Sequence, residues 1–402
     1  AKSPGFMPVP SRMSPGTTIS RVCLVFLLSI VLASATDSTL INVLPVYVLD
    51  HGGTNSMAGA MITGLTVASI LTRLVCGPLT DKFGRKRLLV IGSTSYALNA
   101  LAYCFAPNLG TVIALRVLNG ITQGIFFPVP PTLVADLVPR QRLVDGMGFF
   151  GVASSISFAV VPTISLAVYE AWGSSFLFGW ITLTTAASAV LTFLIRVGAG
   201  GPAALEEPPH PRRFGVDTIF DRSVAGLGAV NLLLMLGSVA ISNFTVAFGL
   251  SRGIEGIALF TVVVNGTALV TKLLVGSMVR KVSQKGLVTL CCLLEGGAAV
   301  VLAFSYSLPA ALAGAALYGF GNAVTSQLLQ VMVIERVEDR RRGVAMATFS
   351  LFGDVGSGVG GTAAGMVSQH LGYTAAYLFS ALTLGFAGCV GGMGSLRKRK
   401  RG

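Results

Sequence analysis

Twelve long apolar stretches, separated by short polar segments, constrain the fold of this chain more than any other feature. An α-helix needs roughly 20 apolar residues to cross the hydrocarbon core of a bilayer. Charged residues make up only 11% of the chain, whereas soluble domains contain about 25%. We therefore predict an all-α integral membrane protein with twelve transmembrane helices. The stretches are residues 21–49, 56–77, 88–106, 110–135, 143–169, 173–196, 222–250, 256–279, 287–306, 309–334, 343–369 and 373–396.

The basic residues are distributed very unevenly between the segments that connect these stretches. If both termini are cytoplasmic, the termini and the cytoplasmic connections hold 25 of the 29 lysines and arginines, and the outer connections hold only Arg252. Because cytoplasmic loops of membrane proteins carry the excess of Lys and Arg, we expect an even number of spans with both ends in the cytoplasm. The net charge of +13 is then a determinant of membrane topology and does not indicate nucleic-acid binding.

A segment rich in Gly and Pro divides the twelve stretches six and six. We expect it to be a flexible cytoplasmic linker between two helical bundles. The predicted organisation is an N-terminal lead over 1–20, a six-helix bundle over 21–196, the linker over 197–221, a second six-helix bundle over 222–396 and a basic cytoplasmic tail over 397–402.

The two halves repeat at a constant offset of 199 residues, and no gap is needed from the second to the fifth stretch of each half. Since the offset spans six helices, both halves have the same topology, and this makes the repeat a parallel one. Two similar bundles around a central path are the geometry of alternating access. Matching positions include Arg73 and Lys272, Gly77 and Gly276, Lys86 and Lys285, Gly120 and Gly319, Asp136 and Glu335, and Arg142 and Arg341.

A charged turn with two glycines, GPLTDKFGRKR over residues 77–87, connects the second and third stretches. It satisfies the pattern G-x-x-x-D-(R/K)-x-G-(R/K)-(R/K), and with the twelve stretches and the parallel repeat the chain resembles the major facilitator superfamily of secondary transporters over about residues 21–396. The copy at 276–285 is degenerate, with Arg280 in place of Asp81 and Ser283 in place of Gly84. The residues that match the motif are Gly77, Asp81, Lys82, Gly84, Arg85 and Lys86.

The resemblance implies that this turn is part of a gate. Asp81 would contact the N-terminal end of the eleventh helix, where free N–H groups favour an anion, and Arg85 would pair with Asp136 at the end of the fourth helix. Both contacts form only when the cytoplasmic ends of the bundles meet, so they would latch an outward-facing state. The alternative is a basic turn that only sets topology; it accounts for Lys82 and Lys86 but not for the acid and the glycines.

The fourth helix resembles that of proton-coupled exporters, because Arg116 is followed by Gly120, Gln123 and Gly124. The fifth helix matches the exporter signature only in part, since Val161 stands where a glycine would precede Pro162. The resemblance extends to bacterial exporters of drugs, sugars and opine-type metallophores. It favours proton-coupled export of a small amphiphilic or zwitterionic molecule. The alternatives are a facilitator or importer of a small polar solute, a lipid flippase, and a membrane-embedded enzyme, for which no catalytic constellation is present.

Ionisable side chains inside the apolar stretches are few, and their burial in a membrane is costly enough to make each a functional candidate. Asp37 lies in a polar patch of the first stretch, and Arg116 lies at a similar depth in the fourth. We hypothesise that Asp37 is the protonation site and that Arg116 is its partner or a contact for an anionic substrate. The alternative is a static ion pair between the two helices. Asp354 is a second candidate proton site or a polar packing residue.

For three other ionisable residues, structural roles are the favoured interpretation. Glu295 is in the ninth helix, which is peripheral in this family, so we expect it to stabilise packing. Arg73 and Lys272 lie near the cytoplasmic ends of their helices. Long basic side chains in such positions can extend to the membrane surface, although their occurrence as a repeat pair leaves a role in a gate open.

Polar side chains on the first, fourth, seventh and tenth helices are the candidates for substrate binding, because these helices line the path in the family. Asn119 and Gln123 share one helical face with Arg116, and this stripe is the strongest indication of a binding site. Aromatic side chains, among them Tyr47, form an apolar wall or face lipid. The remaining candidates are Asn42, Asn231, Asn243, Asn322 and Gln327.

The expected partners are a small-molecule substrate, protons and membrane lipids, without nucleic acid, and we expect a monomer in the bacterial cytoplasmic membrane. No phosphate-binding loop is present, so ATP is not the expected energy source. No cofactor is implied. The three histidines are isolated from one another, and we expect no metal site.

Overall fold

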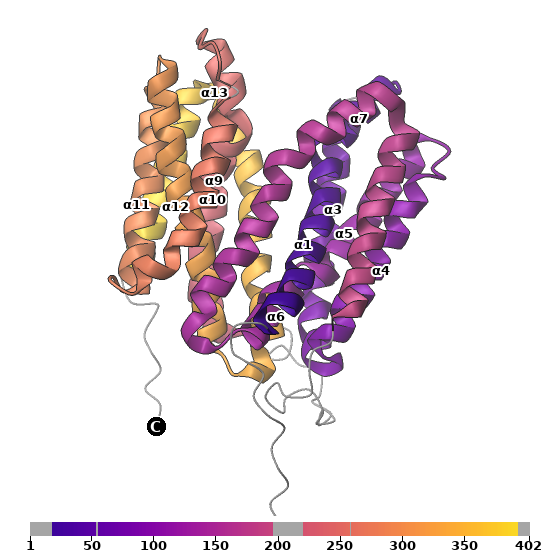
Figure 1. The fold of residues 1–402 in the computed structure, drawn as a ribbon. Helices are drawn as coiled ribbons and strands as arrows, with labels where there is room; N and C mark the ends of the chain where they lie inside the picture. Colours follow the sequence, from indigo (N-terminus) through magenta and orange to yellow (C-terminus); the bar gives the residue numbers. More distant parts are fainter. Residues whose placement is uncertain (1–17, 54, 196–219, 258, 393–402) are drawn as a thin grey trace, which may run out of the picture.

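The structure is a computed structural model that describes residues 18–53, 55–195, 220–257 and 259–392 (Figure 1). The predicted basic tail, the predicted linker up to residue 219 and the predicted lead up to residue 17 lie outside this range. The described end of the lead, Thr18 to Ser20, is already helical, because α1 begins at Thr18.

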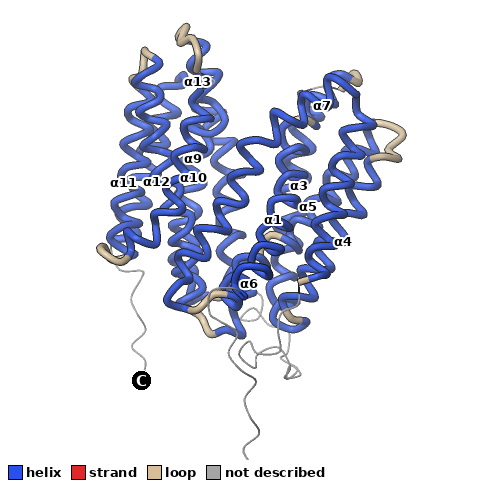
Figure 2. Tube along the Cα trace, in the orientation of Figure 1, coloured by secondary structure: helices blue, strands red, loops and turns tan. Residues whose placement is uncertain are grey.

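The described residues form helices joined by short turns, with no strand among them (Figure 2). The first half contains α1 (Thr18–Asn42), α2 (Leu44–Asp50), α3 (Asn55–Phe83), α4 (Arg85–Tyr103), α5 (Leu109–Phe126), α6 (Val129–Leu137) and α7 (Leu143–Leu194). The second half contains α9 (Ala225–Ser251), α10 (Leu259–Val279), α11 (Gln284–Ala303), α12 (Leu308–Arg336) and α13 (Arg342–Gly392). Three short 3₁₀ turns cover Arg140–Arg142, Arg222–Val224 and Asp339–Arg341.

The helices α7 and α13 each reverse direction at a glycine. Gly173 in α7 has φ 77° and Gly372 in α13 has φ 84°, a backbone region that glycine adopts without the steric cost of a side chain. The two glycines are 199 residues apart. The repeat therefore extends to the last turn of each half.

Eight segments of the described chain are long and apolar enough to cross a membrane. The helices α3, α4 and α12 are also long enough to do so, and α3 contains a shorter apolar segment over Met61–Cys76. Helices with polar groups are stable in a membrane when neighbouring helices cover those groups.

Each half packs mainly on itself, and the two halves meet mainly through two helix pairs (Figure 1). The first pair is α3 against α13, and the second is α10 against α7. Because α10 is the repeat of α3 and α13 is the repeat of α7, these are the same contact made twice. The halves lean apart toward one end of the molecule (Figure 2). We call the opposite end, which carries the α3–α4, α6–α7 and α12–α13 turns, the basic end.

Close helix packing within each half depends on glycines that also repeat. A side chain at Gly120 on α5 would collide with the carbonyl oxygen of Leu65 on α3, and one at Gly319 on α12 would collide with that of Val264 on α10. Small residues at membrane helix interfaces allow such backbone contact. This packing places the polar face of α5 against α1 and α4.

Candidate functional site

The first half contains a buried polar cluster around Asp37 of α1. This side chain is 6% exposed and accepts hydrogen bonds from the amide of Gln123 on α5 and from the hydroxyl of Tyr96 on α4, at 3.5 Å in the second case. The cluster arises because α1 carries a run of small polar residues from Ser34 to Thr39 that is buried inside the half. A carboxyl group is thus held between three helices by neutral partners.

The predicted stripe on α5 is present, and its members contact each other. Arg116 donates to Asn119 Oδ1 at 2.9 Å, and Gln123 Nε2 lies 3.4 Å from the same oxygen. The carboxyl of Asp37 is bound by Gln123, and Arg116 lies two helical turns away from Gln123 along α5. The role of Arg116 as the partner of Asp37 or as a substrate contact stays a prediction. The amide nitrogen of Asn119 is buried and has no hydrogen-bond partner among the described residues.

Two further candidates in the first half do not join this cluster. Asn42 is exposed and donates to the carbonyl of Ser38 on its own helix, at 2.7 Å. Tyr47 is buried among aromatic rings, with its ring centroid 5.3 Å from that of Phe178. The role of Tyr47 in an apolar wall stays a prediction; in this structure α2 packs the ring against Phe178 and His51.

The candidates in the second half are dispersed. Asn231 on α9 is buried and donates to the carbonyl of Phe349 on α13 at 3.2 Å. Asn243 is exposed, and Asn322 is half-buried. Gln327 on α12 is buried and donates to the carbonyl of Val144 on α7 at 2.7 Å. Gln327 therefore joins the two halves, and its amide nitrogen is already occupied in this state.

An ionic network joins the two halves at the basic end. Arg85 at the start of α4 contacts Asp136 of α6, the pair that the family resemblance implied, and also contacts the backbone carbonyl of Asp339. Arg342 at the start of α13 lies 3.1 Å from Asp136 and 2.8 Å from Asp339. Arg140 is 3.2 Å from Asp339. Asp136 is thus shared between an arginine from each half.

Sequence reasoning missed Asp339, Arg342 and Arg140. A signal for one contact was available, because Arg140 and Asp339 are 199 residues apart and have opposite charges. Positions that match in a two-fold repeat can meet at the axis, and here they do.

Parts of the predicted turn motif lie outside what the structure describes. The side chains of Asp81 and Lys82, and the surroundings of Gly77, are among these. Gly84 stands at the start of α4 with φ 84°, which explains why a glycine occupies this position. Lys86 is half-buried. The contact proposed for Asp81 remains a prediction.

A second set of polar contacts between the halves lies farther along the helices from the turns of the basic end. Arg73 of α3 is 2.6 Å from Asp354 of α13. Lys272 of α10 donates to the hydroxyl of Ser155 and to the carbonyl of Gly151 on α7, at 2.7 and 3.1 Å. Arg73 matches Lys272, and Ser155 matches Asp354, in the repeat. Extension of both basic side chains to the membrane surface was the wrong interpretation, since both cross to the opposite half.

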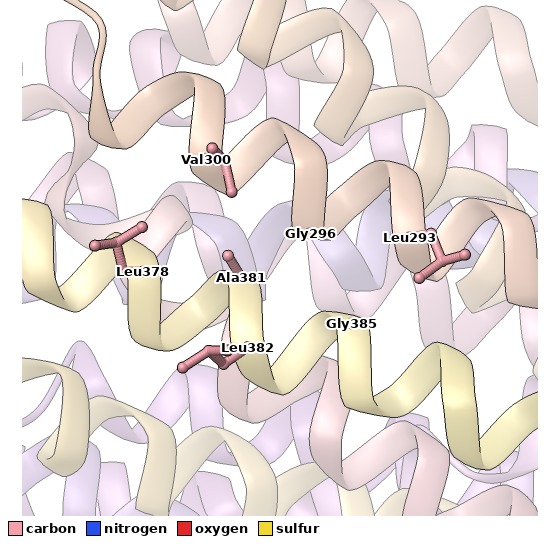
Figure 3. A pocket seen from close by; sticks show the side chains of 7 residues that line it. All are labelled: Leu293, Gly296, Val300, Leu378, Ala381, Leu382 and Gly385. Atoms are coloured by element: carbon pink, nitrogen blue, oxygen red, sulfur yellow. The ribbon is translucent and has the colours of Figure 1, made fainter.

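An apolar groove lies between α11 and α13 (Figure 3). The side chains that line it carry no polar group, so it offers nothing to orient a charged substrate. Its lining residues are Leu293, Gly296, Val300, Leu378, Ala381, Leu382 and Gly385.

Two repeated halves of membrane-length helices, joined at one end and enclosing buried polar clusters, define the class of a membrane transporter. The chain matches the Major Facilitator Superfamily over residues 26–263 and 224–400. The protein belongs to this superfamily, whose members are transporters and not enzymes.

Individual relatives are distant. An uncharacterized MFS-type transporter of Methanocaldococcus jannaschii is 20% identical over 345 residues, which cover 85% of this chain and 89% of that protein. The quinolone resistance protein NorA of Staphylococcus aureus is 27% identical over 124 residues, so the match spans 31% of this chain and about a third, 32%, of NorA. A solved structure of a bacterial homologue of the iron transporter ferroportin, in an outward-facing state, has a TM-score of 0.78 at 16% identity and covers 92% of this chain and 98% of that chain. That likeness shows the shared fold.

Proposed function

We propose that this protein is a secondary active transporter that exports a small amphiphilic or zwitterionic molecule in exchange for protons. The observation that carries the proposal is the Asp37 cluster. Asp37 is a buried carboxyl group that forms no ion pair with any described residue and is held by Gln123 and Tyr96. Such a group can gain and lose a proton without breaking a salt bridge, which suits a coupling site.

The stripe on α5 links this proton site to a site for substrate. Gln123 contacts Asp37 and lies near Asn119, which accepts from Arg116. Arg116 and the unpartnered amide of Asn119 are the donors that an anionic substrate group would use. When Asp37 takes up a proton, its bond with Gln123 weakens and the stripe rearranges, so that proton binding and substrate binding oppose each other.

Twelve membrane crossings in two six-helix bundles, over 21–196 and 222–396, are the proposed topology. The eight apolar segments, the further long helices α3, α4 and α12, and the reversal at Gly372 support this number. The charge distribution supports cytoplasmic termini and a cytoplasmic linker over 197–221. We place the protein, as a monomer in contact with lipid, in a bacterial cytoplasmic membrane.

The basic end is the proposed cytoplasmic gate, closed in this structure. The contacts of Arg342 with Asp136 and of Arg85 with the backbone of Asp339, which both cross between the halves, support an outward-facing state, as does the likeness in fold to an outward-facing transporter. Gly77, Asp81, Gly84 and Lys86 complete the gating motif in this proposal. Inward opening would require the contacts between the halves to break: Arg342 with Asp136, and Arg85 and Arg140 with Asp339.

Transport in sealed proteoliposomes tests the proposal. With a quinolone and ethidium as probes, an imposed pH gradient should drive wild-type transport against the probe gradient. Asp37→Asn should abolish this uphill transport and leave exchange of probe between the two sides intact. Uphill transport by Asp37→Asn at the wild-type rate would contradict the coupling role of Asp37.

Asp50→Asn is the matched control. Asp50 is exposed at the end of α2 and accepts from Tyr169 at 2.8 Å, a bond that asparagine can also accept. If the rate of probe transport by the wild type does not depend on the pH gradient, the protein is a facilitator. Movement of fluorescent phospholipids, without movement of either probe, would indicate a lipid flippase.

A further inference from the structure

The second half contains a buried carboxyl group that the proposed mechanism does not use. Glu295 of α11 is 0% exposed. Its Oε1 accepts from the hydroxyl of Thr325 on α12 at 2.8 Å. Its Oε2 is buried and has no hydrogen-bond partner among the residues that the structure describes. The sequence favoured a packing role for Glu295 on a peripheral helix, but the side chain points into the interior of the half.

Among the residues that the structure describes, none places a positive charge against Glu295. On α12 the facing groups are Thr325, the amide of Asn322 and the phenol of Tyr318. On α13 the backbone of Ala381 and Gly385 packs against the adjacent Gly296 (Figure 3). The titratable neighbours are the thiols of Cys291 and Cys292, on the same helix, and Tyr318.

Glu295 and its neighbours occupy the positions in the second half that match the Asp37 cluster of the first half. Glu295 matches Tyr96, Asn322 matches Gln123 and Tyr318 matches Asn119, all at the offset of 199 residues. The position that matches Asp37 is Leu236. Each half therefore holds one buried carboxyl group among amide and phenol side chains, and the helix that supplies the acid has changed from the first helix of the half to the third.

A carboxylate in such surroundings is costly. Burial of an anion without a cation and with one oxygen unpaired is far less favourable than burial of the neutral acid. The packing of α12 on Glu295 is also close, because a side chain at Gly321 would lie 2.6 Å from Glu295 Cγ. A proton can add to the carboxyl group without any rearrangement of this packing.

Hydroxyl groups lie between this cluster and an exposed residue. The Tyr318 hydroxyl lies 3.4 Å from Ser242 Oγ on α9, and Ser242 is exposed. Ser238, one turn away on α9, is buried beside this path. Hydroxyl groups can both donate and accept, so the path from Ser242 through Tyr318 toward Glu295 is suited to proton exchange.

We propose that Glu295 is a second proton-binding site, so that the transporter carries one exchangeable proton in each half; this rests on the proposed proton-coupled function. The proton adds to Oε2 of the carboxylate from water at Ser242 and leaves by the same route. Thr325 stays bound to Oε1 and orients the carboxyl group.

Infrared spectroscopy of the protein in lipid nanodiscs tests the site without any substrate. Titrated from acid to alkali, the wild type should show a C=O stretch of a neutral carboxylic acid that shifts in D₂O and disappears as the pH rises. Glu295→Gln should lack this band, and Asp37→Asn should lack a different one. The control Glu170→Gln changes an exposed acid on α7 and should keep both bands.

Several outcomes would overturn the assignment. A spectrum of Glu295→Gln identical to that of the wild type would do so, and so would a Glu295 band that neither exchanges in D₂O nor responds to pH, since that describes a fixed structural acid. If Glu295→Gln does not fold, Thr325→Val serves instead. It removes the bond to Oε1 and should shift the frequency of the band, and an unshifted band would contradict the site.

Proteoliposomes then separate this inference from the proposed function. Exchange of two protons for one ethidium cation moves net charge, so wild-type transport should respond to membrane potential. Transport by Glu295→Gln should become independent of potential, and an unchanged dependence would overturn the two-proton stoichiometry. A pH-dependent Glu295 band in a protein that moves no probe under a pH gradient would leave the site in place and contradict proton-coupled export.

Discussion

At the scale of single residues, the two halves meet through contacts that occupy the same place in the repeat but differ in charge. Arg73 faces Asp354, whereas Lys272 faces the hydroxyl of Ser155. The first contact is an ion pair, and the second leaves a lysine held by neutral acceptors. The two sides of the interface therefore differ in how strongly they resist separation.

The ion pair yields a prediction about stability. Arg73→Gln leaves Asp354 as a poorly solvated acid and should lower the free energy of unfolding by about 2 kcal/mol, below the roughly 3–5 kcal/mol measured for fully buried pairs, because the two side chains are 11% and 24% exposed. Asp354→Asn should cost a similar amount. The double variant should cost less than the sum, since neither charge is then left alone.

Denaturant unfolding in detergent measures this double-mutant cycle. Lys272→Gln serves as the control at the matching position and should cost less, because its partners are neutral. Additive effects of Arg73→Gln and Asp354→Asn would show that the two residues do not interact.

Only some of the contacts between single residues could be predicted from the sequence. The pairing of Arg85 with Asp136 follows from a motif, because both residues belong to one half and their separation is set by local helices. The position of Arg342 depends on how the halves dock, and no motif encodes it. The contact of Gln123 with Asp37 was not predicted, although Gln123 lies on the same helical face as Arg116, because a helical face does not fix which of its turns reaches the carboxyl.

At the scale of helices, close packing of α3 with α5 depends on Gly120. Alanine at this position would meet the carbonyl of Leu65, and such overpacking typically costs about 1–3 kcal/mol. We expect Gly120→Ala to lower the melting temperature, and Gly319→Ala to do the same at the repeated contact between α10 and α12.

Gly179 on α7 provides the control, since a side chain there meets nothing within 4 Å. Alanine in an open helical position should stabilise by about 0.5–1 kcal/mol. Thermal unfolding in detergent distinguishes the variants. A melting temperature for Gly120→Ala that rises as much as that for Gly179→Ala would contradict the close approach.

The positions of the helices were largely predictable, since each apolar stretch lies on a helix of the structure. Their breaks were not. The first stretch divides into α1 and α2 at Val43, just before Pro45, and the fourth divides into α5 and α6 near Pro128. Proline lacks a backbone donor and disturbs the preceding turn, but whether a helix bends or ends there depends on the neighbours that bind the freed carbonyls.

At the scale of the whole molecule, the repeat predicts two halves of like topology, and the structure contains the same helix contacts in both. The angle between the halves has no counterpart in the sequence. It is set where the charges of Arg85, Asp136, Asp339 and Arg342 converge, and these residues come from turns that are far apart in the chain.

These charges yield a prediction about the balance of conformations. Asp136→Asn removes the acid that Arg85 and Arg342 share, and leaves two arginines facing each other across the halves. The closed basic end should lose stability by about 2 kcal/mol, which shifts a two-state equilibrium by more than tenfold. The inward-facing state should then become populated.

Spin labels at Glu170 and Glu255, which are exposed at the ends of the halves that lean apart, would report this shift as a shorter distance in pulsed electron resonance. The labels require a variant without the native cysteines. Asp50→Asn, which removes a carboxylate far from the network, should leave the distances unchanged. If Asp136→Asn also leaves them unchanged, the network does not hold the basic end closed, and the docking of α3 on α13 and of α10 on α7 must set the angle alone.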